Sequence, residues 1–478
     1  MSLKSKKFMK ESDDALRQKS NLFSQNALHP LNVKKAIMTK TLRRFNAIVF
    51  TGLLAFCSAV SAQERTESIE PVDNSASIVN VRDFGAVGDG QFDNTEAFQK
   101  ALNSLSPLGG TVEVPVGQYR FSDNIIIPQS VTLRGPWNSV TAHNGCRDQG
   151  LPKPTDDGAT FIVTANQGNE DADAFITLNT NSVLQGVVLY WIDQKENDVP
   201  VPYPWAIKMR GKNPAVIDVE LLNPYKGIDA SENERALIRN VHGQPLYRGI
   251  FVDKIYDIGR IENVHFNPWW SMEPKLFRWQ MENGRAFVFK RTDWHYVLNT
   301  FCFGYLVGYE FGGSDSGLCN GNFLGIGADS CHTSVLVEQS AAFGILITNG
   351  EFVAMKGDNP TEVVVGKDNS GSVRFSNCAF WGPSEQIARI SGRGMVAFSD
   401  CEFVQWDRNN IGKPAIQVDG GSVMIRGCNF QQKKNQVKLE STTERAIITD
   451  NFVSGELRIE SQCENARIEG NIGSSLNK

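Results

Sequence analysis

The sequence predicts an all-β solenoid, in which short strands stack coil upon coil. A short pattern of Asn, Asp or Gly, two variable residues and Phe returns along the C-terminal half at an irregular period of about 20 to 30 residues. The segments between these turns are short and rich in β-branched residues, which is typical of strands and not of helical repeats. The 42 glycines, which follow no Gly-X-Y period, agree with many tight turns.

The N-terminal residues predict an export signal. Basic residues precede an apolar run over 47–56, and small residues follow it up to Ala62, so we expect cleavage after Ala62. The apolar run is about half of the roughly 20 residues that a membrane span needs, so we expect no membrane span in the mature protein. The predicted organisation is an N-terminal extension and signal peptide over 1–62, of which 38–62 is the signal, a linker over 63–77, and a β-helix domain over 78–478.

The charge of the mature chain excludes one class of partner. Removal of 1–62 leaves 37 basic and 50 acidic residues, a formal net charge of −13. Such an acidic chain is not a general nucleic-acid binder, and we expect no nucleic-acid partner.

Cysteines recur at one position of the predicted coil. Cys378, Cys401 and Cys428 follow the turn residue in three successive coils, where stacked strands lie about 4.8 Å apart. We interpret them as small buried hydrophobic residues of an interior stack. A disulfide remains possible for one pair, Cys319 and Cys331.

Residues 79–101 form a motif. It contains Val-Asn-Val-Arg-Asp-Phe-Gly-Ala-Val-Gly-Asp-Gly, followed by Asp-Asn-Thr-Glu-Ala-Phe. A second short stretch, Gly-Gly-Thr-Val-Glu-Val-Pro, follows at 109–115. This stretch resembles the opening of the rhamnogalacturonase/epimerase-like branch of the pectate-lyase superfamily. The resemblance implies a single-stranded, right-handed parallel β-helix with an N-terminal capping helix. The residues agree, since Asp93 or Asn94 can cap a helix that runs to about Leu105 and carries an apolar face.

The resemblance leaves the chemistry open, because members of this superfamily hydrolyse, eliminate or epimerise glycans and others are phage tailspikes. The aspartate motifs of the polygalacturonase-like members are absent from the coils of this chain. Hydrolysis of pectin by that aspartate trio is therefore disfavoured.

One strand of each coil carries cations at its start. In the family, active residues lie on the strand that often begins Gly-Ile, and the equivalent strands here are preceded by Trp205, Lys226, Arg248 and Arg285, with Tyr225 and Tyr247 beside them. Stacking would place these cations in a column that concentrates an anionic sugar chain. Lys226 or Arg248 could then serve elimination at a uronate, which needs a base and a cation.

Carboxylates offer a competing mechanism. Asp229 and Asp253 follow the Gly-Ile positions of two neighbouring coils, and two carboxylates roughly 5 to 9.5 Å apart can run glycoside hydrolysis. These aspartates could equally end strands, or bind Ca²⁺ as a possible cofactor.

Aromatic residues gather between 190 and 309, where six of the nine tryptophans lie. Trp269, Trp270 and Trp294 fall in a segment, 267–299, that departs from the coil pattern, so we expect an exposed glycan platform there. His295, beside Asp293, adds a titratable candidate for catalysis.

These observations predict a secreted or periplasmic β-helix enzyme that cleaves an acidic polysaccharide, with β-elimination as the first hypothesis. A glycoside hydrolase with paired carboxylates and a non-catalytic, adhesive glycan-binding β-helix are the alternatives. Both a monomer and a homotrimer are compatible with the sequence.

Overall fold

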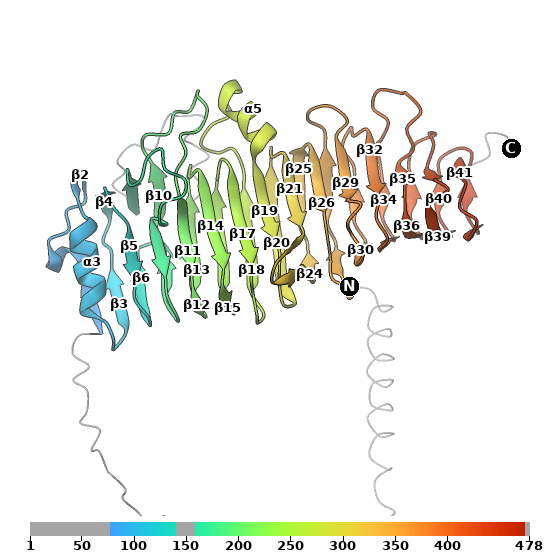
Figure 1. Ribbon diagram of the computed structural model, residues 1–478. Coiled ribbons are helices and arrows are strands. Elements are labelled where there is room, and N and C mark those ends of the chain that lie inside the picture. The colour runs from blue at the N-terminus through green and yellow to red at the C-terminus, as the bar shows by residue number, and fades with distance from the viewer. Residues whose placement is uncertain (1–76, 140–157, 474–478) are drawn as a thin grey trace, which may run out of the picture. The chain divides into compact units, whose positions relative to one another are not determined.

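The computed structural model describes residues 77–139 and 158–473, and these confirm the predicted all-β fold (Figure 1). The predicted signal peptide and all but the last residue of the predicted linker lie outside the described residues. Almost every strand pairs in parallel with the equivalent strand of the next coil, and two long sheets result, of 26 and 13 strands. No helix in the described ranges is long and apolar enough to cross a membrane.

The 13-stranded sheet contains one strand from each coil, and its strands follow in chain order. We call it the groove sheet. Its strands are β5 (Ile125–Ile127), β8 (Ile176–Leu178), β11 (Trp205–Met209), β14 (Lys226–Ser231), β17 (Arg248–Asp253), β19 (Arg285–Phe289), β21 (Val307–Phe311), β26 (Thr333–Val337), β29 (Thr361–Val365), β32 (Gln386–Ile390), β35 (Ile416–Val418), β38 (Val437–Leu439) and β41 (Ile459–Ser461).

The opposing 26-stranded sheet closes the coil around a continuous core. Its strands near the middle of the chain are β13 (Ala215–Leu221), β16 (Leu237–Gly243), β18 (Arg260–Phe266), β20 (His295–Phe303), β24 (Gly321–Leu324) and β27 (Ile345–Thr348). Inside the coil, Ile228, Ile250, Phe287 and Tyr309 form one row across four strands of the groove sheet, and all four are buried. The rings of Phe287 and Tyr309 stack with centroids 4.7 Å apart, as the parallel register demands.

The predicted ladder of turn residues is confirmed. Asp218, Asn240 and Asn263 lie in successive coils with positive φ angles of 56°, 53° and 52°, a conformation that Asn and Asp tolerate better than most residues. Their side chains bond to one another: Asn263 Nδ2 donates to Asn240 Oδ1, and Asn240 Nδ2 donates to Asp218 Oδ1, both at 2.8 Å. The ladder fixes the bend of each coil and therefore which residues of the following strand point into the core.

The cysteines pack as the sequence predicts. Cys378, Cys401 and Cys428 are buried in one column and carry free thiols. Cys319 and Cys331 are buried and free as well, so the disulfide that stayed open for them is not formed. Burial raises the pKa of the Cys319 thiol to about 12, which makes it a poor nucleophile.

Helix α3 (Thr95–Ser104) packs its apolar face on the first coils. The Phe98 ring meets the rings of Tyr119 and Phe121 edge to face, at 5.2 and 4.9 Å. Asp93 Oδ1 accepts a bond from the Thr95 amide at 3.1 Å, whereas Asn94, at the N-cap position, turns its side chain to Val87.

A second helix, α5 (Pro274–Asn283), follows β18 and stands at one edge of the solenoid (Figure 1). The segment predicted to depart from the coil pattern is shorter than expected, because 285–289 and 295–303 form the regular strands β19 and β20. The departure is confined to 267–284, where the chain forms a loop and α5 before it re-enters the groove sheet.

Candidate functional site

The predicted cation column lies on the outer face of the groove sheet. Trp205, Lys226, Arg248 and Arg285 are register partners on β11, β14, β17 and β19, so each is about 4.8 Å from the next along the backbone. They line one groove together with Glu170, Asp171, Asp229, Tyr247, Phe251, Val288, Lys290 and Glu310. Six residues predicted as site residues, from four successive coils, therefore meet in one place.

Three of the four groove cations are held by carboxylates. Lys226 Nζ lies 2.9 Å from Glu170 Oε2 and also donates to the Glu170 carbonyl. Arg285 pairs with Glu310, and Lys290 Nζ lies 2.8 Å from Glu310 Oε1. Burial alone would lower the pKa of Lys290, but its bonds to Glu310 and Glu338 outweigh this and raise that pKa. The charge of these three cations is therefore already compensated by carboxylates.

Arg248 differs from its neighbours, because no carboxylate of the described residues pairs with it. Its Nη1 donates to the carbonyls of Tyr247 and Asn283 at 3.0 and 3.2 Å. Its Nη2 donates to the Tyr247 hydroxyl at 2.9 Å, and the guanidinium lies 3.7 Å from the centre of that ring. Burial lowers the pKa of Arg248 without removing its charge. The groove therefore presents one rigid cation that is partly removed from water and open to an anion.

Aromatic rings form the wall beside Arg248. The rings of Tyr225 and Tyr247 stack with centroids 5.0 Å apart, and Trp279 of α5 lies 6.0 and 5.8 Å from them. Tyr225 is buried, which raises its pKa to about 12 and keeps it protonated. Tyr247 is more exposed and lines the groove.

The two predicted catalytic aspartates are in different situations. Asp229 lines the groove, where Oδ2 lies 3.3 Å from Lys208 Nζ and Oδ1 accepts the Ser231 amide. Asp253 Oδ1 accepts three bonds, from the amides of Lys254 and Arg291 and from Ser314 Oγ. Asp253 thus serves to hold three chain segments together and is not among the groove-lining residues.

Comparisons with known proteins agree with the fold. Residues 78–195 match the family model described as rhamnogalacturonase A/epimerase, pectate lyase-like. The A-module of the mannuronan C-5 epimerase AlgE6 of Azotobacter vinelandii superposes with a TM-score of 0.51 at 16% identity, over 83% of this chain and 100% of that one. The DFA-IIIase of Arthrobacter chlorophenolicus superposes with a TM-score of 0.52 at 10% identity, over 83% and 99%.

The fold is the pectate-lyase-like right-handed β-helix. At the level of sequence, alginate lyase 7 of Azotobacter vinelandii is 52% identical over 44 residues, which cover 9% of this chain. This match spans only 5% of the length of that relative, so the sequence likeness is confined to a short stretch. The family resemblance predicted from the opening motif is confirmed.

Besides Asp253, the structure places four predicted site residues of this β-helix outside the groove. Trp270 is buried in a hydrophobic cluster with Leu276 of α5. Trp269 packs on the rings of His242 and His265, which project from the 26-stranded sheet, and the Trp294 ring lies 6.0 Å from Phe343.

His295 is the fourth of these residues and lies in the interior, on β20. Neither ring nitrogen has a hydrogen-bond partner, and burial lowers its pKa to about 3. Because its ring is buried in the core, His295 does not contact the groove.

Several groove residues were not among the predicted site residues. Glu170 and Asp171 come from a loop, and Trp279 comes from α5. Lys290 and Glu310 carried a usable signal, because Glu310 lies between the aromatic residues Tyr309 and Phe311 of β21, and Lys290 directly follows Phe289 at the end of β19. The described residues contain no cluster of three or more side chains suited to a metal, and the fit of Ca²⁺ stays a prediction.

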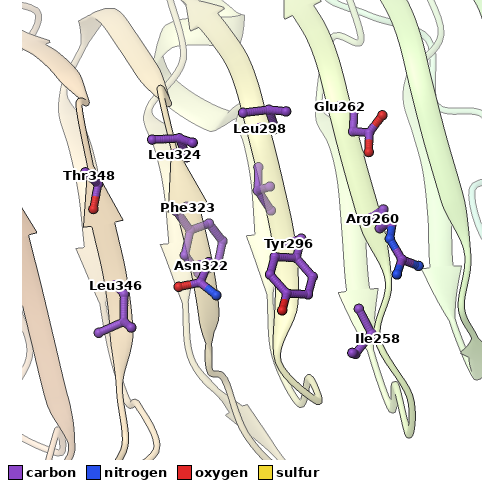
Figure 2. A pocket seen from close by; sticks show the side chains of 11 residues that line it. Ile258, Arg260, Glu262, Tyr296, Leu298, Asn322, Phe323, Leu324, Leu346 and Thr348 are labelled. Carbon is purple, nitrogen blue, oxygen red and sulfur yellow. The ribbon is translucent and has the colours of Figure 1, made fainter. Parts of the chain in front are cut away.

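A second hollow lies on the outer face of the 26-stranded sheet, away from the groove sheet. Figure 2 shows Tyr296 and Leu298 of β20 beside Leu324 of β24 and Leu346 of β27, with Arg260 and Glu262 of β18 at one edge. Its lining is mostly apolar, and Tyr296 is 41% exposed.

Proposed function

We propose that the groove binds an acidic polysaccharide and that the protein removes the proton next to a uronate carboxylate. The observation that carries this proposal is Arg248, the cation without a carboxylate partner among the described residues. A uronate carboxylate would complete the arrangement, because guanidinium groups bind carboxylates with two parallel hydrogen bonds. Two similar proteins, a mannuronan epimerase and an alginate lyase, act on uronate polymers, which supports this substrate class.

The reaction needs a charge stabiliser and a base. Loss of the proton beside the carboxylate places negative charge on the carboxylate oxygens, where Arg248 would stabilise it in a partly dehydrated site. Tyr247 is the better placed base, since it lines the groove and Arg248 Nη2 donates to its hydroxyl oxygen, which fixes that oxygen beside the cation. Lys226, one of the two residues that the sequence offered for elimination, is paired with Glu170, so we assign it to the binding of the sugar chain.

Two outcomes follow from the same first step. If the carbanion expels the sugar at its β-position, the product is an unsaturated sugar and the protein is a lyase. If a proton returns to the other face of the ring, the product is an epimer and the chain stays intact. We keep elimination as the first hypothesis and epimerisation as its nearest variant.

Paired-carboxylate hydrolysis fits the groove less well. Asp253 is engaged by three donors, and the next carboxylate in the row of Asp229 is Glu310. Three strand spacings separate Asp229 from Glu310, about 14 Å along the sheet. This exceeds the separation of about 9.5 Å at which two carboxylates share one glycosidic bond.

The test is incubation of the chain from residue 63 onward with alginate, polygalacturonate and sulfated polysaccharides, with and without EDTA. Ultraviolet absorbance reports elimination, reducing ends report hydrolysis, and incorporation of deuterium from D₂O reports epimerisation. We expect absorbance or deuterium with a uronate polymer. Reducing ends alone would point to the hydrolase, and binding without any chemical change would point to the adhesive alternative.

Tyr247→Phe provides a sharper test of the proposed base. We expect kcat to fall about 100- to 1000-fold, because a positioned acid or base contributes a factor of this order. The dissociation constant for the polymer should change little, since the ring remains stacked on Tyr225. Tyr225→Phe is the matched control, and we expect nearly full activity from it. Equal losses in the two variants would show that the Tyr247 hydroxyl has no special role.

A further inference from the structure

A separate hollow opens on the same face of the groove sheet, nearer the N terminus. It lies between α3 and the strands β5 and β8. Its lining is rich in amides and contains one cation, with the residues Gln99, Asn103, Ser106, Asn124, Ile126, Pro128, Asp173, Ala174, Thr177, Asn179 and Arg210.

This hollow is aligned with the groove. Thr177, Lys208, Asp229 and Phe251 are register partners on β8, β11, β14 and β17, so they form one row that runs from the hollow to the strand of Arg248. Three strand spacings separate β8 from β17, about 14 Å. That distance is longer than a single sugar ring, so one extended oligosaccharide would be needed to contact both places.

The hollow has the chemistry of a sugar subsite. Arg210 is exposed, and no carboxylate of the described residues forms an ion pair with it. Ile126, 50% exposed, offers an apolar surface to the C–H face of a ring. Amide groups and the Asp173 carboxylate surround them and can bond to hydroxyls.

The floor of the hollow is held in place by α3. Gln99 Oε1 accepts the Ile126 amide at 2.8 Å, and Gln99 Nε2 donates to the Ile126 carbonyl at 3.0 Å. The same Nε2 donates to Asn103 Oδ1 at 2.9 Å. These bonds fix the edge of β5 to the helix, so a sugar would meet a preformed surface.

We propose that this hollow is a distal subsite, which takes a sugar residue of the same acidic chain several rings away from Arg248. Arg210 binds the carboxylate of that residue, and Ile126 contacts its ring. The inference rests on the proposed function and deepens it: the substrate is a long acidic oligosaccharide or polymer, and short fragments bind less tightly because they occupy only one of the two places.

The test is calorimetric binding of size-fractionated oligomers of mannuronate, guluronate and galacturonate, from disaccharide to decasaccharide. For the unchanged protein we expect affinity to rise with length and then level off. Arg210→Ala should weaken the longest oligomers about five- to tenfold, the value of one charge-assisted contact, and leave the shortest unchanged. Ile126→Glu, which adds a repelling carboxylate at an exposed site, should show the same length dependence. Arg239→Ala, an exposed arginine on the other sheet, is the matched control.

The outcomes separate this inference from the proposed reaction. A length-dependent loss without any elimination or epimerisation would keep the subsite and overturn the proposed chemistry. An equal loss at all lengths, no loss in either variant, or no binding of any oligomer would overturn the subsite. Elimination or epimerisation together with length-independent binding would keep the reaction and overturn only the subsite.

Discussion

Arg248→Gln is expected to lower kcat by about 100- to 1000-fold on whichever uronate polymer proves to be the substrate. The substitution keeps a hydrogen-bond donor but removes the charge opposite the carboxylate, where negative charge develops as the proton leaves. The loss of one such contact in a water-poor site costs about 2.7–4 kcal/mol of transition-state stabilisation. Steady-state kinetics with the polymer measures the effect directly.

The matched control is Arg374→Gln, which changes an exposed arginine on the 26-stranded sheet. We expect full activity from this control. Arg248→Lys should recover part of the loss, because lysine keeps the charge but cannot reproduce the two parallel bonds of a guanidinium. Nearly full activity of Arg248→Gln would exclude Arg248 from the reaction and return attention to Asp229.

The column of cations could be predicted because it depends on a local rule. The strands β11, β14, β17 and β19 start at similar motifs, and the parallel register then stacks Lys226, Arg248 and Arg285 on one another. The sequence could not reveal that Glu170 and Glu310 neutralise two of these cations. Glu170 lies in a loop. The path of that loop, which brings Glu170 to Lys226, is not determined by the coil repeat of the sequence. Only the three-dimensional structure therefore shows that Arg248, unlike Lys226 and Arg285, has no carboxylate partner among the described residues.

The placement of His295 shows where reasoning from sequence failed. The residues around it were assigned to an irregular segment, so the inside and outside positions of the strand were not assigned. Trp294 has a positive φ of 48°, and regular alternation begins only after it, with His295 and Val297 inside and Tyr296 outside. Val297, as an apolar residue within a strand, could have indicated that His295 shares its interior face.

The interior position of His295 leads to an expected loss of stability in acid. In the unfolded chain this histidine takes up a proton near pH 6.5, whereas in the folded chain its pKa is about 3. Between these values the unfolded state binds more protons, so the free energy of unfolding falls by about 1.4 kcal/mol for each pH unit of acidification. His242, with a pKa lowered to about 4 by burial and by His265, acts in the same direction.

His295→Leu should remove this part of the pH dependence, because leucine has a similar volume and no proton to bind. From pH 7.5 to 4.5 we expect the unfolding free energy of the variant to fall by about 2–3 kcal/mol less than that of the unchanged protein. Urea unfolding at the two pH values measures the difference. His332→Leu, at a partly exposed histidine whose ring bonds to Thr333 and Asp358, controls for loss of any histidine. Equal acid losses in the unchanged protein and His295→Leu would mean that the His295 ring gains a proton in the folded state, which its unpartnered nitrogens and its contact with the Phe289 ring oppose.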